Sequence, residues 1–588
     1  MTSKNDSIQM LLQLIGNVCT NETCGTLDGF LTTIGRHHSI DEVGLKQVDH
    51  VWQLRSAFMI LTMQSGFALL ETGCVSSKNI ANIMVKNIID VAFGGLSYWM
   101  FGYALSFGHP STPYCGMGNF FLWDVTPENM GTIYTDYFFQ FCFASTATTI
   151  ISGALAERMR MHAYIILSFM NIISYCIPAC WIWNQKGFLK CLGFYDAAGS
   201  FGVHGNGGVS ALVGTMMLGP RRGRFKHPEH YQMSSPVTAL TGTLLLWWSW
   251  FAFNSGSTLG SSGESGQLWK INALISCNTL NGSVGGCITG ILLSMLLKRG
   301  RVDISYVINS VLGSLVSITA ICTVTSPLQS LIIGSIGALI TVGSFRLLRF
   351  LKIDDPVGAI PVHLCAGAWG TVSVGLFGRN DFLNTLKYDG LFHGGGAYLF
   401  GIQVFGIVTI SFWSAVTTAA VLYIAQKTVG LRLSKEDERL GADVVEHGIV
   451  KSEGLRGLAH VDEGDTVQIN DDLTEDQILL LKRVGLMMLS NRERSPNGFA
   501  HGKISESIQY RTQAWRQRAN TRLAKKSMGS IGRHTIDLGD STVVYSDGRP
   551  ASNRSRSDSE LPSVEQIESP TNYSERQNMR DLNVFTIG

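Results

Sequence analysis

The sequence predicts an all-α polytopic membrane protein: eleven transmembrane helices, arranged as an inverted five-helix repeat plus an eleventh helix, with a partly disordered cytosolic tail. Charged residues make up 15% of the 588 residues, against about 25% in an ordinary soluble domain. They concentrate after residue 426, whereas long apolar runs precede it. Because no long basic stripe precedes the tail, nucleic-acid binding is excluded.

The membrane helices are predicted from segments of about 20 mostly apolar residues, the length that crosses a bilayer. Eleven segments qualify: 52–73, 82–107, 134–156, 161–183, 201–219, 237–257, 270–297, 302–324, 328–348, 357–377 and 397–426. Several contain Gly and Ser throughout, and small residues let membrane helices approach one another closely. We therefore expect a tightly packed bundle.

The orientation follows from the basic residues of the short loops. One set of alternate loops is rich in them: Lys78, Arg158, Arg160, Arg221, Arg222, Arg224, Lys226, Lys298, Arg299, Arg301, Arg346, Arg349 and Lys352. The other set contains few, so the rich set is predicted to be cytosolic. An odd number of spans then places the N-terminal segment (1–50) outside the cell. Sequons at Asn5 and Asn21 predict a glycoprotein, and Cys19 and Cys24 on the same side can pair.

The last part of the chain has a different composition. Residues 427–450 carry charges of both signs, and 451–588 form the predicted cytosolic tail. Residues 476–490 are expected to form one amphipathic helix. From about residue 491 onward Ser, Arg, Asn and Asp dominate, which predicts disorder.

Two segments of the chain repeat one another. Asp196 lies eight residues before His204, and Asp355 lies eight residues before His363; in both segments the His follows a Val and opens an apolar, Gly-rich stretch. The two histidines fall in spans five and ten, which cross in opposite directions. This pattern is typical of an inverted repeat, whose shared site lies near the bilayer midplane.

A membrane-buried His is a functional hypothesis by default, although a core His bonded to a neighbouring helix is the structural alternative. Two facing imidazoles can share one proton and titrate as a unit. Aromatic residues lie near the predicted outer ends of neighbouring spans: Phe143, Trp183 and Phe253, beside Ser257. An interfacial aromatic belt is common, but rings beside a hydroxyl can also hold a small cation that donates hydrogen bonds.

These residues together resemble the ammonium transporter (Amt/Mep/Rh) superfamily, and its Amt branch in particular. The matching motifs are 153–158 (GALAER), 196–204, 250–257, 354–363 and 430–448, and the resemblance covers about residues 50–450. It implies that 51–426 is an ammonium transporter domain of eleven helices, that 427–450 is a cytosolic regulatory segment, and that the protein is a homotrimer in the plasma membrane.

The resemblance also implies roles for individual residues. Trp183, Ser257 and Phe143 would recruit ammonium on the outer side. Phe143 and Phe253 would form the gate beneath them, and His204 and His363 would line the pore. Asp196 would support recruitment or deprotonation, through local structure as well as charge. Gly441 and Asp443 lie in the segment that would couple neighbouring protomers. Lys86 and Asp90, four residues apart, are predicted to form a buried structural pair.

The functional expectation is ammonium uptake: the cation is recruited, gives up its proton, and crosses as ammonia with or without that proton. An ammonium sensor signalling through the tail is the alternative. An intramembrane metalloenzyme is a third hypothesis, but the two histidines lack a nearby third ligand, and neither a cofactor nor a metal is expected.

Overall fold

The computed structural model describes residues 27–449, except 264–265 and 382, together with 459–461, 467–469 and 479. All of them belong to one unit, Met1–Arg516; the second unit, Gln517–Gly588, contains none of the described residues. The glycosylation, disulfide, amphipathic-helix and disorder predictions for 1–26, 476–490 and 491–588 lie outside the described residues.

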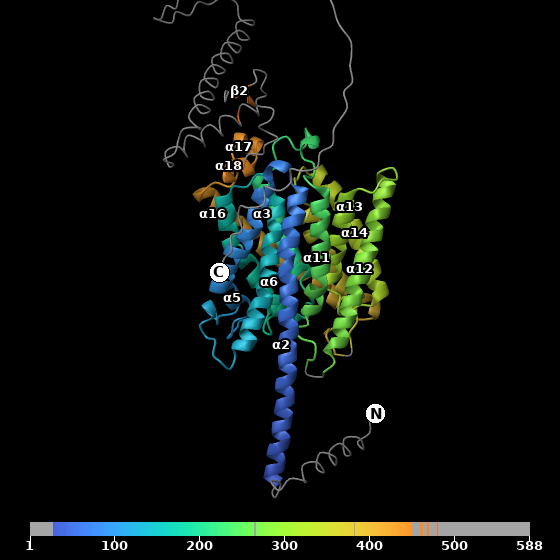
Figure 1. The fold of residues 1–588 in the computed structure, drawn as a ribbon. Coiled ribbons are helices and arrows are strands. Elements are labelled where there is room, and N and C mark those ends of the chain that lie inside the picture. Colours follow the sequence, from blue (N-terminus) through green and yellow to red (C-terminus); the bar gives the residue numbers. More distant parts are fainter. Residues whose placement is uncertain are drawn as a thin grey trace, which may run out of the picture. The chain divides into compact units, whose positions relative to one another are not determined.

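Each of the eleven expected spans is helical (Figure 1). In chain order the helices are α2 (Leu27–Cys74), α3 (Ile80–Ile89), α4 (Gly95–Ser97), α5 (Tyr103–Phe107), α6 (Met130–Leu155), α7 (Met161–Met170), α8 (Ile172–Trp183), α9 (Phe188–Leu192), α10 (Asn206–Leu218), α11 (Pro236–Gly256), α12 (Leu268–Leu297), α13 (Ile304–Thr319), α14 (Pro327–Phe350), α15 (Ala366–Phe377), α16 (Tyr398–Thr428), α17 (Lys435–Leu440) and α18 (Ala442–His447).

Shorter turns complete or connect these helices. The 3-10 turns are η1 (Ser77–Asn79), η4 (Phe120–Leu122), η6 (Pro228–His230) and η8 (Leu391–His393), and the π-helical turns are η2 (Asp90–Gly94), η3 (Tyr98–Gly102), η5 (Ser200–Gly205) and η7 (Ile360–Cys365). The second expected span is therefore one helical stretch, from α3 to α5, that contains two π-turns. The fifth and tenth spans each begin with a π-turn.

Seven helical stretches of the described chain are long and apolar enough to cross a membrane: Ser77–Phe107, Met130–Leu155, Met161–Leu192, Leu268–Leu297, Pro327–Phe350, Ile360–Phe377 and Tyr398–Thr428. The eighth expected span (302–324) is a shorter apolar helix, α13. The remaining three expected spans, in α2, α10 and α11, are helical but are not both long enough and apolar enough to be counted among these seven. The protein is thus a helical membrane protein with fewer strongly apolar helices than the sequence predicted.

The structure adds detail to two expectations about local structure and corrects a third. The helix that contains the first expected span is longer than the span, because α2 starts at Leu27 and continues through a polar stretch. The membrane domain is all-helical as predicted, and the described strands lie after it: β1 (Ala459–Val461) and β2 (Val467–Ile469) pair antiparallel, with His460 opposite Gln468. This short hairpin lies in 451–475, for which the sequence predicted no secondary structure.

The corrected expectation concerns Lys86 and Asp90, which do not form the predicted pair. Lys86 Nζ donates to the Met159 carbonyl at 3.0 Å, and Asp90 Oδ2 accepts from the Tyr164 hydroxyl at 2.6 Å. The π-turn η2 begins at Asp90. The turn from Lys86 to Asp90 is a regular α-helical one, since the Asp90 amide bonds to the Lys86 carbonyl. The spacing therefore holds, but each side chain hydrogen-bonds to a partner outside this helix instead of to the other.

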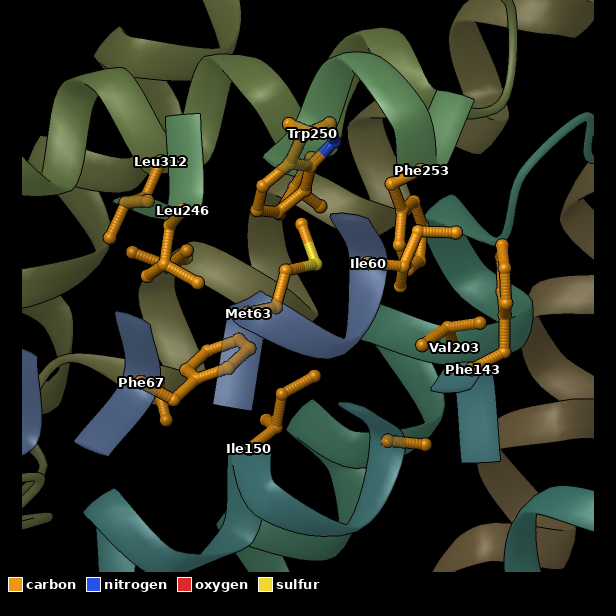
Figure 2. Packing of buried hydrophobic residues seen from close by; sticks show 14 of the residues in the cluster. Ile60, Met63, Phe67, Phe143, Ile150, Val203, Leu246, Trp250, Phe253 and Leu312 are labelled. Carbon is orange, nitrogen blue, oxygen red and sulfur yellow. The ribbon is translucent and has the colours of Figure 1, made fainter. Parts of the chain in front are cut away.

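Small residues let the helices pack closely, as the sequence predicts. A Cβ added to Gly334 of α14 would lie 2.0 Å from the carbonyl oxygen of Gly282 in α12, so only glycine permits this backbone contact. Helix starts are also specified locally: Ser326 and Gln329 form a capping box at α14, and Pro327 occupies its first turn. The largest apolar cluster lies among α2, α6, α10, α11 and α13 (Figure 2).

Candidate functional site

The two repeat histidines meet in the interior. His204 and His363 are buried, and their Nδ1 atoms lie 3.3 Å apart with the rings stacked at 24°. Two nitrogens at this distance share one proton, because one must donate and the other accept. No other described group hydrogen-bonds to the Nε2 atom of His204. Each histidine belongs to a π-turn, η5 or η7, a feature that is frequent at functional sites.

A glycine four residues after each histidine permits this contact. A Cβ on Gly208 would lie 2.4 Å from the amide nitrogen of Leu364, the residue after His363. A Cβ on Gly367 would lie 2.5 Å from the Ser200 carbonyl oxygen, at the start of η5. The two halves of the repeat therefore cross backbone to backbone, and this crossing brings the imidazoles together.

The repeat aspartates cap the turns that carry the histidines. The two carboxylate oxygens of Asp196 accept from four consecutive amides, residues 199–202, at 2.7–3.0 Å. Asp355 accepts from Gly358 and Ile360 at 2.9 and 2.7 Å. The carboxylate of Asp196 therefore holds the backbone of this turn in place. It connects to the predicted recruitment residues through its carbonyl, which accepts from Trp183 Nε1 at 2.9 Å.

Aromatic rings continue the row of imidazoles on one side. His204 lies 5.3 Å from Phe253, and Phe253 stacks on Phe143 at 4.2 Å and 23°, measured between ring centroids. On the other side, His363 lies 6.0 Å from Phe67. Figure 2 shows Phe253, Phe143 and Phe67 within the buried apolar cluster. The five rings form a continuous row contributed by α2, α6, α11 and the two π-turns.

Each end of this row borders a cavity. The larger has a volume of about 660 Å³ and is lined by Phe143, Trp183 and Ser257, among others. The Ser257 hydroxyl donates to the Phe253 carbonyl at 2.8 Å, which leaves its oxygen lone pairs for a ligand. The smaller, of about 10 Å³, is lined by His363 and Phe67; this volume is about that of one water. The structure thus brings Phe143, Trp183 and Ser257 together at one cavity, with Phe253 and the histidines beyond them.

Three residues of this region were missed by the sequence reasoning. Trp250 stacks on His204 at 4.9 Å and 18°, and its Nε1 donates to Thr319 Oγ1 at 2.8 Å. Its position three residues before Phe253 was the available signal, because residues three apart share a helix face. Asp136 lines the larger cavity and Glu71 lines the smaller one. Both are carboxylates within expected membrane spans, and ionisable residues inside spans commonly line a substrate or ion pathway.

A bundle of apolar helices with a narrow row of buried rings between two cavities is the architecture of a membrane transporter or channel. The comparisons with known proteins identify the family. Residues 51–451 match the model of the Ammonium Transporter Family, and the chain belongs to this family. It is a multi-pass membrane protein, and the family is one of transporters, not enzymes.

The chain is similar to proteins from several kingdoms. It is 42% identical over 420 residues to "Putative ammonium transporter 3" of Caenorhabditis elegans, a match that covers 69% of this chain and 60% of that protein. It is 34% identical over 428 residues to "Ammonium transporter 1 member 3" of Solanum lycopersicum, covering 68% and 92%. The chain thus spans less than two thirds of the worm relative.

Solved structures agree in fold. A structure titled "Sensor Amt Protein" is 31% identical, with a TM-score of 0.63, and the match covers 69% of this chain and all of that chain. Mep2 of Candida albicans is 26% identical, with a TM-score of 0.61, covering 66% and 87%.

Proposed function

We propose that this chain carries ammonium into the cell across the plasma membrane. The observation that carries the proposal is the row of rings, with the histidine Nδ1 atoms 3.3 Å apart, between two cavities. Ammonium enters the larger cavity from outside. There it contacts the faces of Trp183 and Phe143 and donates to Ser257, which offsets part of its lost hydration.

The cation leaves its proton at this cavity. Carrying an unpaired charge along a dry row of rings costs at least several kcal/mol, whereas neutral ammonia avoids this cost. Ammonia passes the gate of Phe143 and Phe253 when these stacked rings rotate, and then exchanges hydrogen bonds with His204 and His363. Potassium has no proton to lose, so the same barrier excludes it.

The proton has two routes. If it returns to the outer solution, the protein is an ammonia channel; if it follows ammonia along the histidine pair, transport is electrogenic. Asp196 supports either route by holding the turn of His204 and the position of Trp183.

The topology proposed with this function is eleven spans built on the inverted repeat, with the N-terminus outside and the C-terminus in the cytosol. Contacts between the basic loops support it. Arg158 donates to the Asp354 carbonyl at 2.8 Å, and Arg221 pairs with Asp354 and Glu157, so three loops assigned to the cytosol meet at one end. The proposed assembly is a homotrimer in which each protomer has its own pore.

Uptake of labelled methylammonium by cells that express the chain tests this function. We expect saturable uptake by the wild type and a loss of about tenfold or more in H204A and H363A, measured at equal surface expression. A wild type at the cell surface without uptake would contradict the proposal. Voltage-clamp current on addition of ammonium separates the two proton routes, since flux without current excludes the electrogenic one.

An ammonium sensor is the second candidate. Its support is the neighbour titled "Sensor Amt Protein" and the contacts of α17 and α18 with the membrane domain. Lys78 Nζ donates to the carbonyls of Glu438 and Arg439, and Asp443 accepts from the Asn82 amide at 2.9 Å. A sensor predicts ammonium-dependent changes in protease cleavage of the tail that persist in H204A; their disappearance in H204A favours transport alone.

A further inference from the structure

The larger cavity contains a carboxylate that the proposed function does not use. Asp136 lines this cavity together with Phe139, Gln140 and Phe143. These four residues of α6 have the spacing i, i+3, i+4 and i+7, so they form one face of the helix. At 1.5 Å per residue, Asp136 lies about 10 Å along the helix axis from Phe143, on the side away from the histidines.

The partners of Asp136 leave its charge uncompensated. Its Oδ1 accepts from the side-chain amide of Gln53 at 2.8 Å, and no Lys or Arg of the described chain forms an ion pair with it. The neighbouring titratable groups are Tyr103, which lines the same cavity, and His50, whose Nε2 lies 3.1 Å from Thr132 Oγ1. A carboxylate bonded to a neutral amide in a recessed cavity retains most of its attraction for a mobile cation.

The charges of the cavity are divided between its walls. Lys190 also lines it, and its Nζ donates to the Trp183 carbonyl at 3.1 Å. His109 and Tyr103 are the two other titratable side chains of the lining. A small cation is repelled by Lys190 and attracted by Asp136, so the face of α6 that leads to Phe143 is the favoured route.

We propose that Asp136 is the first binding position for the substrate cation, two helical turns outside Phe143. It holds a small monovalent cation by charge and so raises the ammonium concentration beside Trp183, Phe143 and Ser257. The position attracts potassium as well, because discrimination occurs further along the row. This inference rests on the proposed function and deepens it.

Three variants test the proposal through the concentration dependence of methylammonium uptake. D136N is expected to raise KM about tenfold with Vmax unchanged, the lower end of the enrichment that a charged cleft gives. K190Q removes the opposing charge and is expected to lower KM. E128Q removes a carboxylate from an exposed position before α6 that does not line the cavity, and we expect wild-type KM.

Ionic strength provides a second criterion. Added salt screens the carboxylate, so the difference in KM between wild type and D136N should shrink as inert salt increases. If Asp136 had only a structural role, D136N would instead lower Vmax or surface expression. The change in KM would then not have opposite signs in D136N and K190Q. An unchanged KM in D136N, a rise in K190Q, or an equal rise in E128Q each overturns the proposal.

Binding of labelled methylammonium to the purified full chain separates this inference from the proposed function. If the wild type binds but does not transport, the proposed function fails while Asp136 is still tested by the dissociation constant of D136N. A wild-type constant in D136N, or no binding to the wild type, overturns the inference.

Discussion

Gly208→Ala should separate the two buried imidazoles of His204 and His363. The added Cβ would lie 2.4 Å from the Leu364 nitrogen and 2.8 Å from its Cα, whereas comfortable contacts are about 3.5 Å. Because both of these atoms belong to the backbone and cannot rotate away, η5 and α10 must move away from η7 by about 1 Å. The Nδ1 atoms of His204 and His363, now 3.3 Å apart, would then exceed hydrogen-bond distance.

The expected result is a large loss of uptake with a moderate loss of stability. Overpacking of this kind costs about 1–3 kcal/mol, so the purified variant should still fold, with a lower Tm. A 1 Å displacement of a working group lowers activity by about 100-fold in favourable cases, and we expect methylammonium uptake to fall at least tenfold. Uptake at equal surface expression and thermal unfolding of purified protein measure the two effects.

Gly401→Ala is the matched control. Gly401 lies in α16, and a Cβ there would meet no atom within 4 Å. The same chemical change should leave uptake unaltered and raise helix stability by about 0.5–1 kcal/mol. Wild-type uptake and KM in Gly208→Ala would refute the reasoning, because the imidazole contact would then not depend on the close crossing.

Three further predictions follow from the site and its supports. Asp196→Ala should lower Tm by more than Asp196→Asn, since Ala leaves four amides without their acceptor at about 1–3 kcal/mol for each buried donor; a stable but inactive Asn variant would show that the charge itself takes part. Phe253→Ala removes one of the two stacked rings of the proposed gate and should increase potassium competition in uptake assays, whereas unchanged competition would exclude a gating role. Burial raises the pKa of Asp354, but the Arg221 guanidinium outweighs it and holds this pKa below the ordinary value of 3.8. The ion pair therefore stabilises the protein above that pH, and its contribution is lost as the pH falls through the lower pKa of the folded state. Asp354→Asn should lower the free energy of unfolding at pH 7 by about 3–5 kcal/mol, and so lower Tm. In strong acid the same substitution should lower Tm much less.

The positions of the spans could be predicted because their signal is local. An apolar run of sufficient length identifies a membrane helix without knowledge of its neighbours. The start of α2 at Leu27 could not be predicted in this way, since its first turns are polar and hydropathy reports only the apolar part. The Lys86–Asp90 prediction failed for another reason: the i, i+4 rule considers one helix alone, whereas Met159 and Tyr164, from elsewhere in the fold, supply the hydrogen-bond partners of these two side chains.

The meeting of His204 and His363 was predictable because the internal repeat carries long-range information. Two equivalent positions in halves of opposite direction imply a shared site, even though they are 159 residues apart. The stacking of Trp250 on His204 and the Asp136 lining have no such repeat signal. Which side chains face a cavity depends on helix rotation, and the sequence of nearly uniformly apolar helices does not specify that rotation.

A series of contacts connects α17 with the turn that carries His363. Asp354 and Asp355 are adjacent, yet Asp354 pairs with Arg221 whereas Asp355 caps the turn of His363. The next residue after Arg221, Arg222, donates its amide to Glu438 of α17 at 2.7 Å. A displacement of α17 therefore acts on the loop that precedes His363 through two adjacent residue pairs, without passing through the apolar helices. Since Gly208 and Gly367 leave little free space at the crossing of the two halves, we predict that a substitution at Glu438, which breaks its contact with Arg222, lowers methylammonium uptake.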